Sequence, residues 1–127
     1  MFITIDETDR RPIYQQVVDE IKALIAAGEL PEGSSLPPVR QVAADLGVNL
    51  NTVAFAYRQL QKAGLIKIRH GAGAVVIAQV IPQGAEEQLQ AKLMPALTDL
   101  ILSGLTRAEV IAVVNNALNT LTGQKAR

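Results

Sequence analysis

Two amphipathic segments joined by a very short turn constrain the fold of this 127-residue chain more than any other feature. Residues 39–46 carry apolar side chains at helical spacing, and the pattern stops at Gly47. Asn49 follows two residues later and predicts the N-cap of another helix, because its short side chain can accept a hydrogen bond from a free backbone N–H. Two helices linked so closely cross at a fixed angle, which predicts a helix-turn-helix.

The residues before this pair predict one more helix. An apolar stripe at helical spacing begins after Pro12, which the first turn of a helix tolerates, and it ends near Gly28. Residues 31–35 have the composition of a turn. Residues 2–5 alternate between apolar and polar side chains, which predicts a short strand at the start of the chain.

The residues after the pair predict a β-hairpin, or wing. Residues 65–69 and 74–78 are apolar segments on either side of a turn that contains glycine. We therefore predict a mainly α fold with a small β-hairpin, in which residues 1–79 form a winged helix-turn-helix domain. The helix-turn-helix lies at about 38–57 and the wing at about 65–78. The predicted core of this domain consists of Ile13, Val17, Ile21, Val42, Leu46, Val53, Leu60 and Ile66.

Residues 80–127 predict a short helical hairpin at the C-terminus. A break at residues 82–84 precedes an apolar stripe in which Pro95 either kinks the helix or starts a new one. Thr106 and Glu109 match a capping box that opens the last helix. Two helices bury too little surface on each other, so we predict that they pair with a second copy of the chain. The predicted dimerisation residues are Leu93, Leu97, Leu100, Val110, Val113, Val114, Ala117 and Leu121.

The distribution of charge favours a nucleic-acid partner. The whole chain has 12 Lys+Arg and 12 Asp+Glu, so its formal net charge is zero. The segment 40–71 nevertheless contains five basic residues against Asp45 alone, a local charge of +4. A solvated helix face would give the same excess by chance, and that interpretation stays open.

Several other classes of function find no support in the sequence. The chain has no Cys, which excludes a disulfide framework and a thiolate metal site. Its one histidine, His70, has no acidic residue nearby, so we expect no metal site and no cofactor. There is no phosphate-binding loop with Lys and no nucleophile elbow, so we expect no enzyme. The acidic start is unlike a signal peptide, and we expect a cytoplasmic protein without a membrane span.

Several motifs together resemble the GntR family of bacterial transcriptional regulators. They are Pro12-Ile13-Tyr14-Gln15-Gln16, Leu36-Pro37-Pro38-Val39-Arg40-Gln41-Val42-Ala43, Gly47-Val48-Asn49-Leu50-Asn51-Thr52-Val53, Ala56-Tyr57-Arg58-Gln59-Leu60 and Gly64-Leu65-Ile66 with Arg69-His70-Gly71-Ala72-Gly73. The resemblance covers about residues 11–79. The short two-helix tail is similar to that of the YtrA-like subfamily, and any effector site would lie there.

The resemblance implies which residues touch DNA. Arg40 is expected to reach a phosphate or a guanine edge, and Arg58 a backbone phosphate. Phe55 stands where the family often has a cation, and it either presses on a thymine methyl or packs against the protein. Asn49 is either a base contact or only a cap, and His70 is either a DNA contact or a solvated turn residue. The full predicted set is Arg40, Asn49, Asn51, Thr52, Phe55, Arg58, Arg69, His70, Gly71 and Gly73.

The function implied is that of a sequence-specific transcriptional regulator. It is expected to act as a homodimer on a palindromic double-stranded operator, as a repressor rather than an activator, with an unknown small-molecule effector. The alternative is a winged helix used as a protein-interaction module without specific DNA binding. Salt separates the two, because phosphate contacts make DNA affinity fall steeply with salt concentration.

Overall fold

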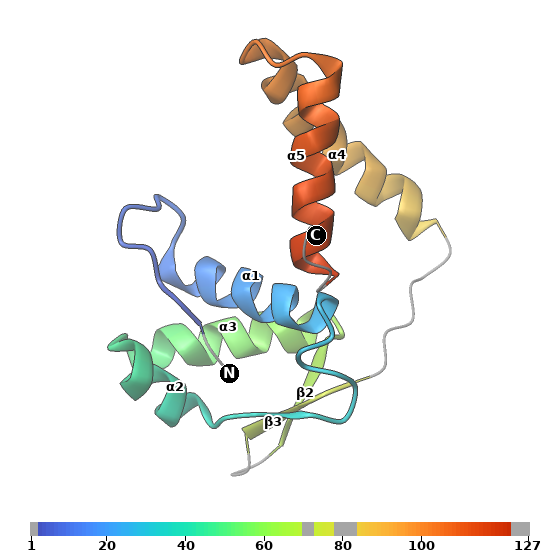
Figure 1. The fold of residues 1–127 in the computed structure, drawn as a ribbon. Helices are drawn as coiled ribbons and strands as arrows, with labels where there is room; N and C mark the ends of the chain where they lie inside the picture. The colour runs from blue at the N-terminus through green and yellow to red at the C-terminus, as the bar shows by residue number, and fades with distance from the viewer. Residues whose placement is uncertain (1–2, 70–72, 78–83, 123–127) are drawn as a thin grey trace. The chain divides into compact units, whose positions relative to one another are not determined.

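The computed structural model describes residues 3–69, 73–77 and 84–122. The chain forms two compact units, residues 1–79 and residues 80–127. The first unit contains three helices and a small antiparallel sheet, and the second contains two helices (Figure 1). Within the described residues, no helix is both long and apolar enough to cross a membrane.

Three helices form most of the first unit. They are α1 (Ile13–Ala26), α2 (Val39–Leu46) and α3 (Leu50–Lys62). Helices α1 and α3 lie side by side (Figure 1), and α2 packs against α3. Each helix places one apolar stripe inward, as its helical spacing predicts. Gly28 has a positive φ of 80° after α1, in agreement with the end predicted there.

The sheet has three strands rather than the two of the predicted hairpin. They are β1 (Ser35–Leu36), β2 (Ile66–Arg69) and β3 (Gly73–Val76), in the order β1-β3-β2. Leu36 pairs with Ala74 on one side of β3, and Ile68 pairs with Ala74 on the other. Ser35 is the first residue of β1, so the turn predicted at residues 31–35 is wrong at its last residue. Two prolines after Leu36 keep β1 short, because proline has no N–H to donate to a sheet.

The strand predicted at residues 2–5 is also wrong over its described part, because residues 3–5 have no strand partner. Ile3 and Ile5 instead pack half-buried against the core. The buried side-chain amide of Gln16 binds the backbone of Asp6, the residue after Ile5. The Asp6 backbone N–H donates to Gln16 Oε1 at 2.9 Å, and Gln16 Nε2 donates to the Asp6 carbonyl at 3.2 Å. A side chain thus takes the place of a neighbouring strand.

The core of the first unit follows the predicted one with one clear exception. Ile13 is 42% exposed, because it lies at the edge of the apolar stripe of α1. Leu46 packs partly buried against the core. The buried hydrophobic residues are Val17, Val18, Ile21, Leu30, Leu36, Val42, Ala43, Val53, Ala56, Tyr57, Leu60, Ile66, Ala74 and Val76.

The second unit is a helical hairpin of α4 (Ala85–Leu102) and α5 (Arg107–Leu121). Pro95 lies inside α4, so it neither ends that helix nor starts another. The predicted capping box is present: Glu109 N–H donates to Thr106 Oγ1 at 3.2 Å, and Thr106 N–H donates to Glu109 Oε1 at 3.1 Å. These bonds hold the pKa of Glu109 below its usual value.

Candidate nucleic-acid interface

The turn between α2 and α3 has the geometry that its residues predict. Gly47 adopts the left-handed conformation with φ of 68°, which ends α2. Val48 N–H then donates to the Ala43 carbonyl at 3.1 Å. Asn49 Oδ1 accepts from the Asn51 backbone N–H at 2.8 Å and caps α3. The Asn49 side chain is exposed, and the cap leaves its amide N–H groups as donors.

The face of α3 opposite the core carries polar, aromatic and cationic side chains. Asn51, Phe55, Arg58 and Lys62 recur every three or four residues there, and all four are exposed. Thr52 is half-buried beside them. Lys62 is missing from the predicted site, although its spacing of four from Arg58 was the signal that would have found it.

Phe55 packs between Tyr14 of α1 and Arg58 of α3. Its ring centroid lies 4.7 Å from that of Tyr14 of α1, with the planes at 85°. The Arg58 guanidinium carbon lies 5.8 Å from the Phe55 centroid, within cation–π range. The side chain remains 37% exposed.

A groove of about 450 Å³ brings the start of α2 and the wing together. Arg40 and Arg69 both line it, and both side chains are exposed. Two guanidinium groups at one groove attract phosphate, because each can donate paired hydrogen bonds to it. The other lining residues are Pro38, Val39, Tyr57, Ile68 and Gly73.

Gly73 is the first residue of β3 and pairs with Arg69, the last residue of β2. Its φ is +77°, and a Cβ there would lie 2.6 Å from the Leu36 carbonyl oxygen. Only glycine permits the wing to approach β1 this closely. His70 and Gly71, which also belong to the predicted DNA-binding set, lie outside the described residues.

Two side chains outside the predicted DNA-binding set, Tyr57 and Gln61, connect the elements of the candidate interface. Tyr57 is fully buried, and its hydroxyl donates to the Pro37 carbonyl at 2.6 Å. Burial raises the pKa of Tyr57 well above its usual value. Gln61 Oε1 accepts from the Ile68 backbone N–H at 2.7 Å, which ties β2 to α3. Both bonds join residues distant in sequence, so no local pattern reveals them.

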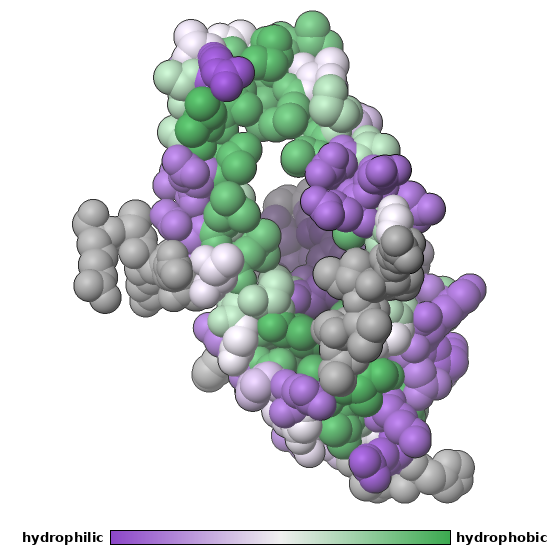
Figure 2. Space-filling model, turned by 90° about the vertical axis from the view of Figure 1, so that its right-hand side faces the viewer, coloured by the Kyte–Doolittle hydropathy of each residue, from purple (hydrophilic) through white to green (hydrophobic). Residues whose placement is uncertain are grey.

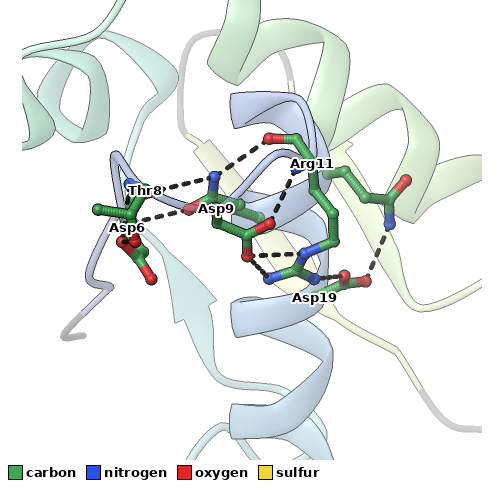
Figure 3. Close-up of polar contacts among 7 residues, drawn as sticks. Asp6, Thr8, Asp9, Arg11 and Asp19 are labelled. Carbon is green, nitrogen blue, oxygen red and sulfur yellow. Dashed lines mark hydrogen bonds and ion pairs between the residues drawn. The ribbon is translucent and has the colours of Figure 1, made fainter.

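The acidic residues near the start of the chain are engaged locally (Figure 3). Arg11 Nη2 lies 2.7 Å from Asp9 Oδ2, and a second Arg11 nitrogen pairs with Asp19 of α1. A hydrogen bond from Arg11 is the main cause that lowers the pKa of Asp9. Thr8 donates to Asp6 from both its backbone and its hydroxyl. Arg11 is therefore occupied, whereas the arginines of the interface have no ion pair among the described residues.

The α4–α5 hairpin leaves most of its apolar side chains uncovered (Figure 2). Val110 is its one buried residue within the described range, while Leu97, Leu100 and Val114 are half-buried. A cavity of about 390 Å³ lies between the two helices, lined mainly by apolar residues. The large exposed apolar side chains are Leu89, Leu93, Met94, Ile101, Leu102, Ile111, Val113, Leu118 and Leu121.

Comparison with known proteins agrees with this architecture. The model of "Bacterial regulatory proteins, gntR family" matches residues 13–76. The HTH-type transcriptional repressor YtrA of Bacillus subtilis is 36% identical over 74 residues, which cover 58% of this chain and 57% of that protein. The HTH-type transcriptional regulator Rv1152 of Mycobacterium tuberculosis is 32% identical over 110 residues, which cover 87% and 88%. The chain thus spans little more than half the length of the first relative and most of the second.

Two solved structures are similar to this chain over different shares of its length. A transcriptional antiterminator from Listeria monocytogenes EGD-e superposes with a TM-score of 0.88 and 27% identity, over 100% of this chain and 97% of that one. The DNA-binding domain of AraR in complex with operator ORX1 gives a TM-score of 0.51 and 28% identity, over 57% and 86%.

These matches confirm the predicted winged helix-turn-helix fold and the family resemblance. The family match covers α1 to β3, which are the elements that build the interface described above. The chain therefore belongs to the gntR family of bacterial regulatory proteins, whose model matches residues 13–76.

Proposed function

We propose that this chain is a cytoplasmic transcriptional repressor that binds a palindromic operator as a homodimer. The observation that carries the proposal is the exposed face of α3, where Asn51, Arg58 and Lys62 follow a capped helix start. Such a helix fits a major groove about 12 Å wide, with its first residues at the base edges. The similar DNA-binding domain of AraR is in complex with an operator in its solved structure, which supports DNA binding by this chain.

Different residues take different roles in this proposal. Asn51 reads a base edge, because its amide can pair with adenine. Arg40 and Arg69 hold the DNA backbone in their common groove, and Arg58 binds a further phosphate. Asn49 and Thr52 lie at the start of α3 and are candidate DNA contacts there, and His70 and Gly71 remain candidate DNA contacts from the sequence. The proposal requires no cofactor, no metal and no catalytic step.

The second unit supplies the dimer interface. Nine large apolar side chains of α4 and α5 are exposed, among them Leu93 at 51% and Leu102 at 78%. A surface of this kind is unfavourable in water and is typical of a helix-bundle interface. Two domains then read two half-sites spaced about 34–36 Å apart, one turn of DNA, or a multiple of it.

The salt dependence of binding tests the DNA part of the proposal. The purified full chain is titrated with a fluorescent duplex at several salt concentrations. Contact with several phosphates predicts that the logarithm of affinity falls linearly with the logarithm of salt concentration. A chain that binds no duplex at any salt concentration is instead a protein-interaction module.

Analytical ultracentrifugation tests the dimer. The full chain is expected to sediment as a dimer at micromolar concentration. Leu93→Glu places a charge in the interface and is expected to give a monomer, because a buried unpaired charge is strongly unfavourable. Gln90→Glu on the same helix adds the same charge at an exposed polar position and serves as the control. A parent chain that is monomeric contradicts the assignment.

A further inference from the structure

We infer that Phe55 is a positioning residue of the DNA interface, which acts by holding the guanidinium of Arg58. The inference rests on the proposed function and assigns a role to the one aromatic side chain on the exposed face of α3. It replaces direct contact between Phe55 and a thymine methyl with an indirect role.

The contact with Tyr14 fixes the orientation of the Phe55 ring. Tyr14 meets it nearly perpendicularly, at 85° and 4.7 Å between centroids, which is a favoured geometry for aromatic pairs. Tyr14 belongs to α1, whereas Phe55 belongs to α3, so the contact crosses between two packed helices. The ring therefore takes its orientation from the body of the domain and not from α3 alone.

Arg58 is three residues after Phe55, so the two side chains are neighbours on the helix surface. Its guanidinium carbon lies 5.8 Å from the ring centroid. Among the described residues, the ion pairs are those of Arg11 with Asp9 and Asp19, so no carboxylate competes for Arg58. Stacking on a ring leaves the N–H groups at the edge of the guanidinium free to donate to a phosphate.

A ring at this position helps because it restricts the rotamers of the Arg58 side chain before DNA binds. A long arginine side chain loses rotamer freedom when it binds a phosphate, and this loss opposes binding. A guanidinium already held against Phe55 has less freedom to lose. If the ring turned toward a thymine methyl, it would give up its contacts with both Tyr14 and Arg58.

A double-mutant cycle on the full chain tests this role. Affinity for a duplex selected by the parent is measured for the parent, Phe55→Leu, Arg58→Ala and the double variant. Phe55→Leu is expected to weaken binding about two- to fivefold, the worth of an exposed cation–π contact. In the Arg58→Ala background the same change is expected to have no effect, because the ring acts through Arg58.

Two further variants separate positioning from folding. Phe55→Tyr keeps the ring and is expected to bind as the parent does. The control is Ala63→Ser, a small change at the exposed C-cap of α3, five residues after Arg58. Thermal unfolding of each variant identifies any loss of affinity that comes from a loss of fold.

Nuclear magnetic resonance of the DNA-free protein gives a readout that does not depend on the proposed function. The side-chain protons of Arg58 are expected to show an upfield ring-current shift that disappears in Phe55→Leu and remains in Phe55→Tyr. An equal loss of affinity from Phe55→Leu with and without Arg58 would mean that the ring touches DNA itself and would overturn this inference alone. A parent that binds no duplex would overturn the proposed function and this inference together.

Discussion

The buried hydroxyl of Tyr57 donates a hydrogen bond to the backbone carbonyl of Pro37, at 2.6 Å. Tyr57 lies in the middle of α3, and Pro37 lies in the segment that leads into α2. The bond therefore joins the helix that carries Asn51 and Arg58 to the entry of the helix that carries Arg40. A single buried group thus fixes the relative position of two parts of the interface.

Tyr57→Phe removes this bond and leaves the Pro37 carbonyl without its partner. We expect a loss of about 1–3 kcal/mol in the free energy of unfolding, measured by urea denaturation. Tyr14→Phe is the matched control, because the Tyr14 hydroxyl makes no hydrogen bond within the described residues and the ring contact with Phe55 is kept. That variant is expected to stay within about 0.5 kcal/mol of the parent. Equal stability of all three proteins would contradict the assignment.

Tyr57 also makes the free energy of unfolding depend on pH in the alkaline range. Burial raises the pKa of Tyr57 in the folded chain above that of an exposed tyrosine, about 10. The folded chain therefore favours the neutral hydroxyl. This stabilisation is complete below the pKa that Tyr57 has in the unfolded chain, and it is lost as the pH rises toward the pKa in the folded chain. The free energy of unfolding of the parent should fall more steeply above pH ~10 than that of Tyr57→Phe. Parallel pH profiles would contradict this account.

Gly73→Ala tests the close approach between the wing and β1. The added Cβ would meet the Leu36 carbonyl oxygen at 2.6 Å, so the wing must shift. Gly64→Ala is the control, because Gly64 has a similar φ of +79° but no atom within 4 Å of the added Cβ. We expect Gly64→Ala to lose about 1–2 kcal/mol from backbone strain and Gly73→Ala to lose more. Equal losses in thermal or urea unfolding would show that the contact with Leu36 is unimportant.

Arg40→Ala tests the groove between α2 and the wing. Arg40 is exposed and lines the groove together with Arg69. If it binds only phosphate, affinity should fall to a similar extent for all duplexes, and the salt slope should decrease by about one. If it reads a guanine, the loss should be about 1–3 kcal/mol, with relaxed preference at that base. Unchanged affinity for every duplex would exclude Arg40 from the interface.

Asn51→Ala and Arg58→Ala separate sequence reading from backbone binding. Asn51 lies in the first turn of α3. Its side chain takes no part in the helix cap, in which only the Asn51 backbone N–H is used. Its replacement should change which sequences are preferred, whereas Arg58→Ala should weaken binding about uniformly. Selection from random duplexes with each variant gives the comparison. If Asn51→Ala keeps the preference of the parent, Asn51 does not read a base.

Local signals account for the parts of the fold that the sequence predicted. Gly47, Asn49 and the Thr106–Glu109 box act within a few residues of their own positions, and the structure places all of them as expected. The errors come from longer-range effects. The two-residue strand β1 is too short to show a period, and it exists because β3 offers it an edge.

Local sequence signals likewise predict one part of the candidate interface but not the part that depends on long-range packing. The spacing of Asn51, Phe55 and Arg58 already placed them on one face of a helix. The edge-to-face contact of Phe55 with Tyr14, 41 residues apart in sequence, depends on how α1 packs against α3, and no local sequence pattern encodes it. The position of Gly73 in β3 likewise depends on its approach to Leu36.

The ratio of specific to non-specific affinity tests the central claim most directly. The chain first selects its preferred duplex from a random pool. Its affinity for that duplex is then compared with its affinity for a scrambled duplex of the same length and composition, and both are measured at the same physiological salt concentration. A sequence-specific regulator should bind the selected duplex tighter by about 10³-fold or more, and the selected sequence should be palindromic. A ratio near one, or a pool without any enriched sequence, would contradict the account.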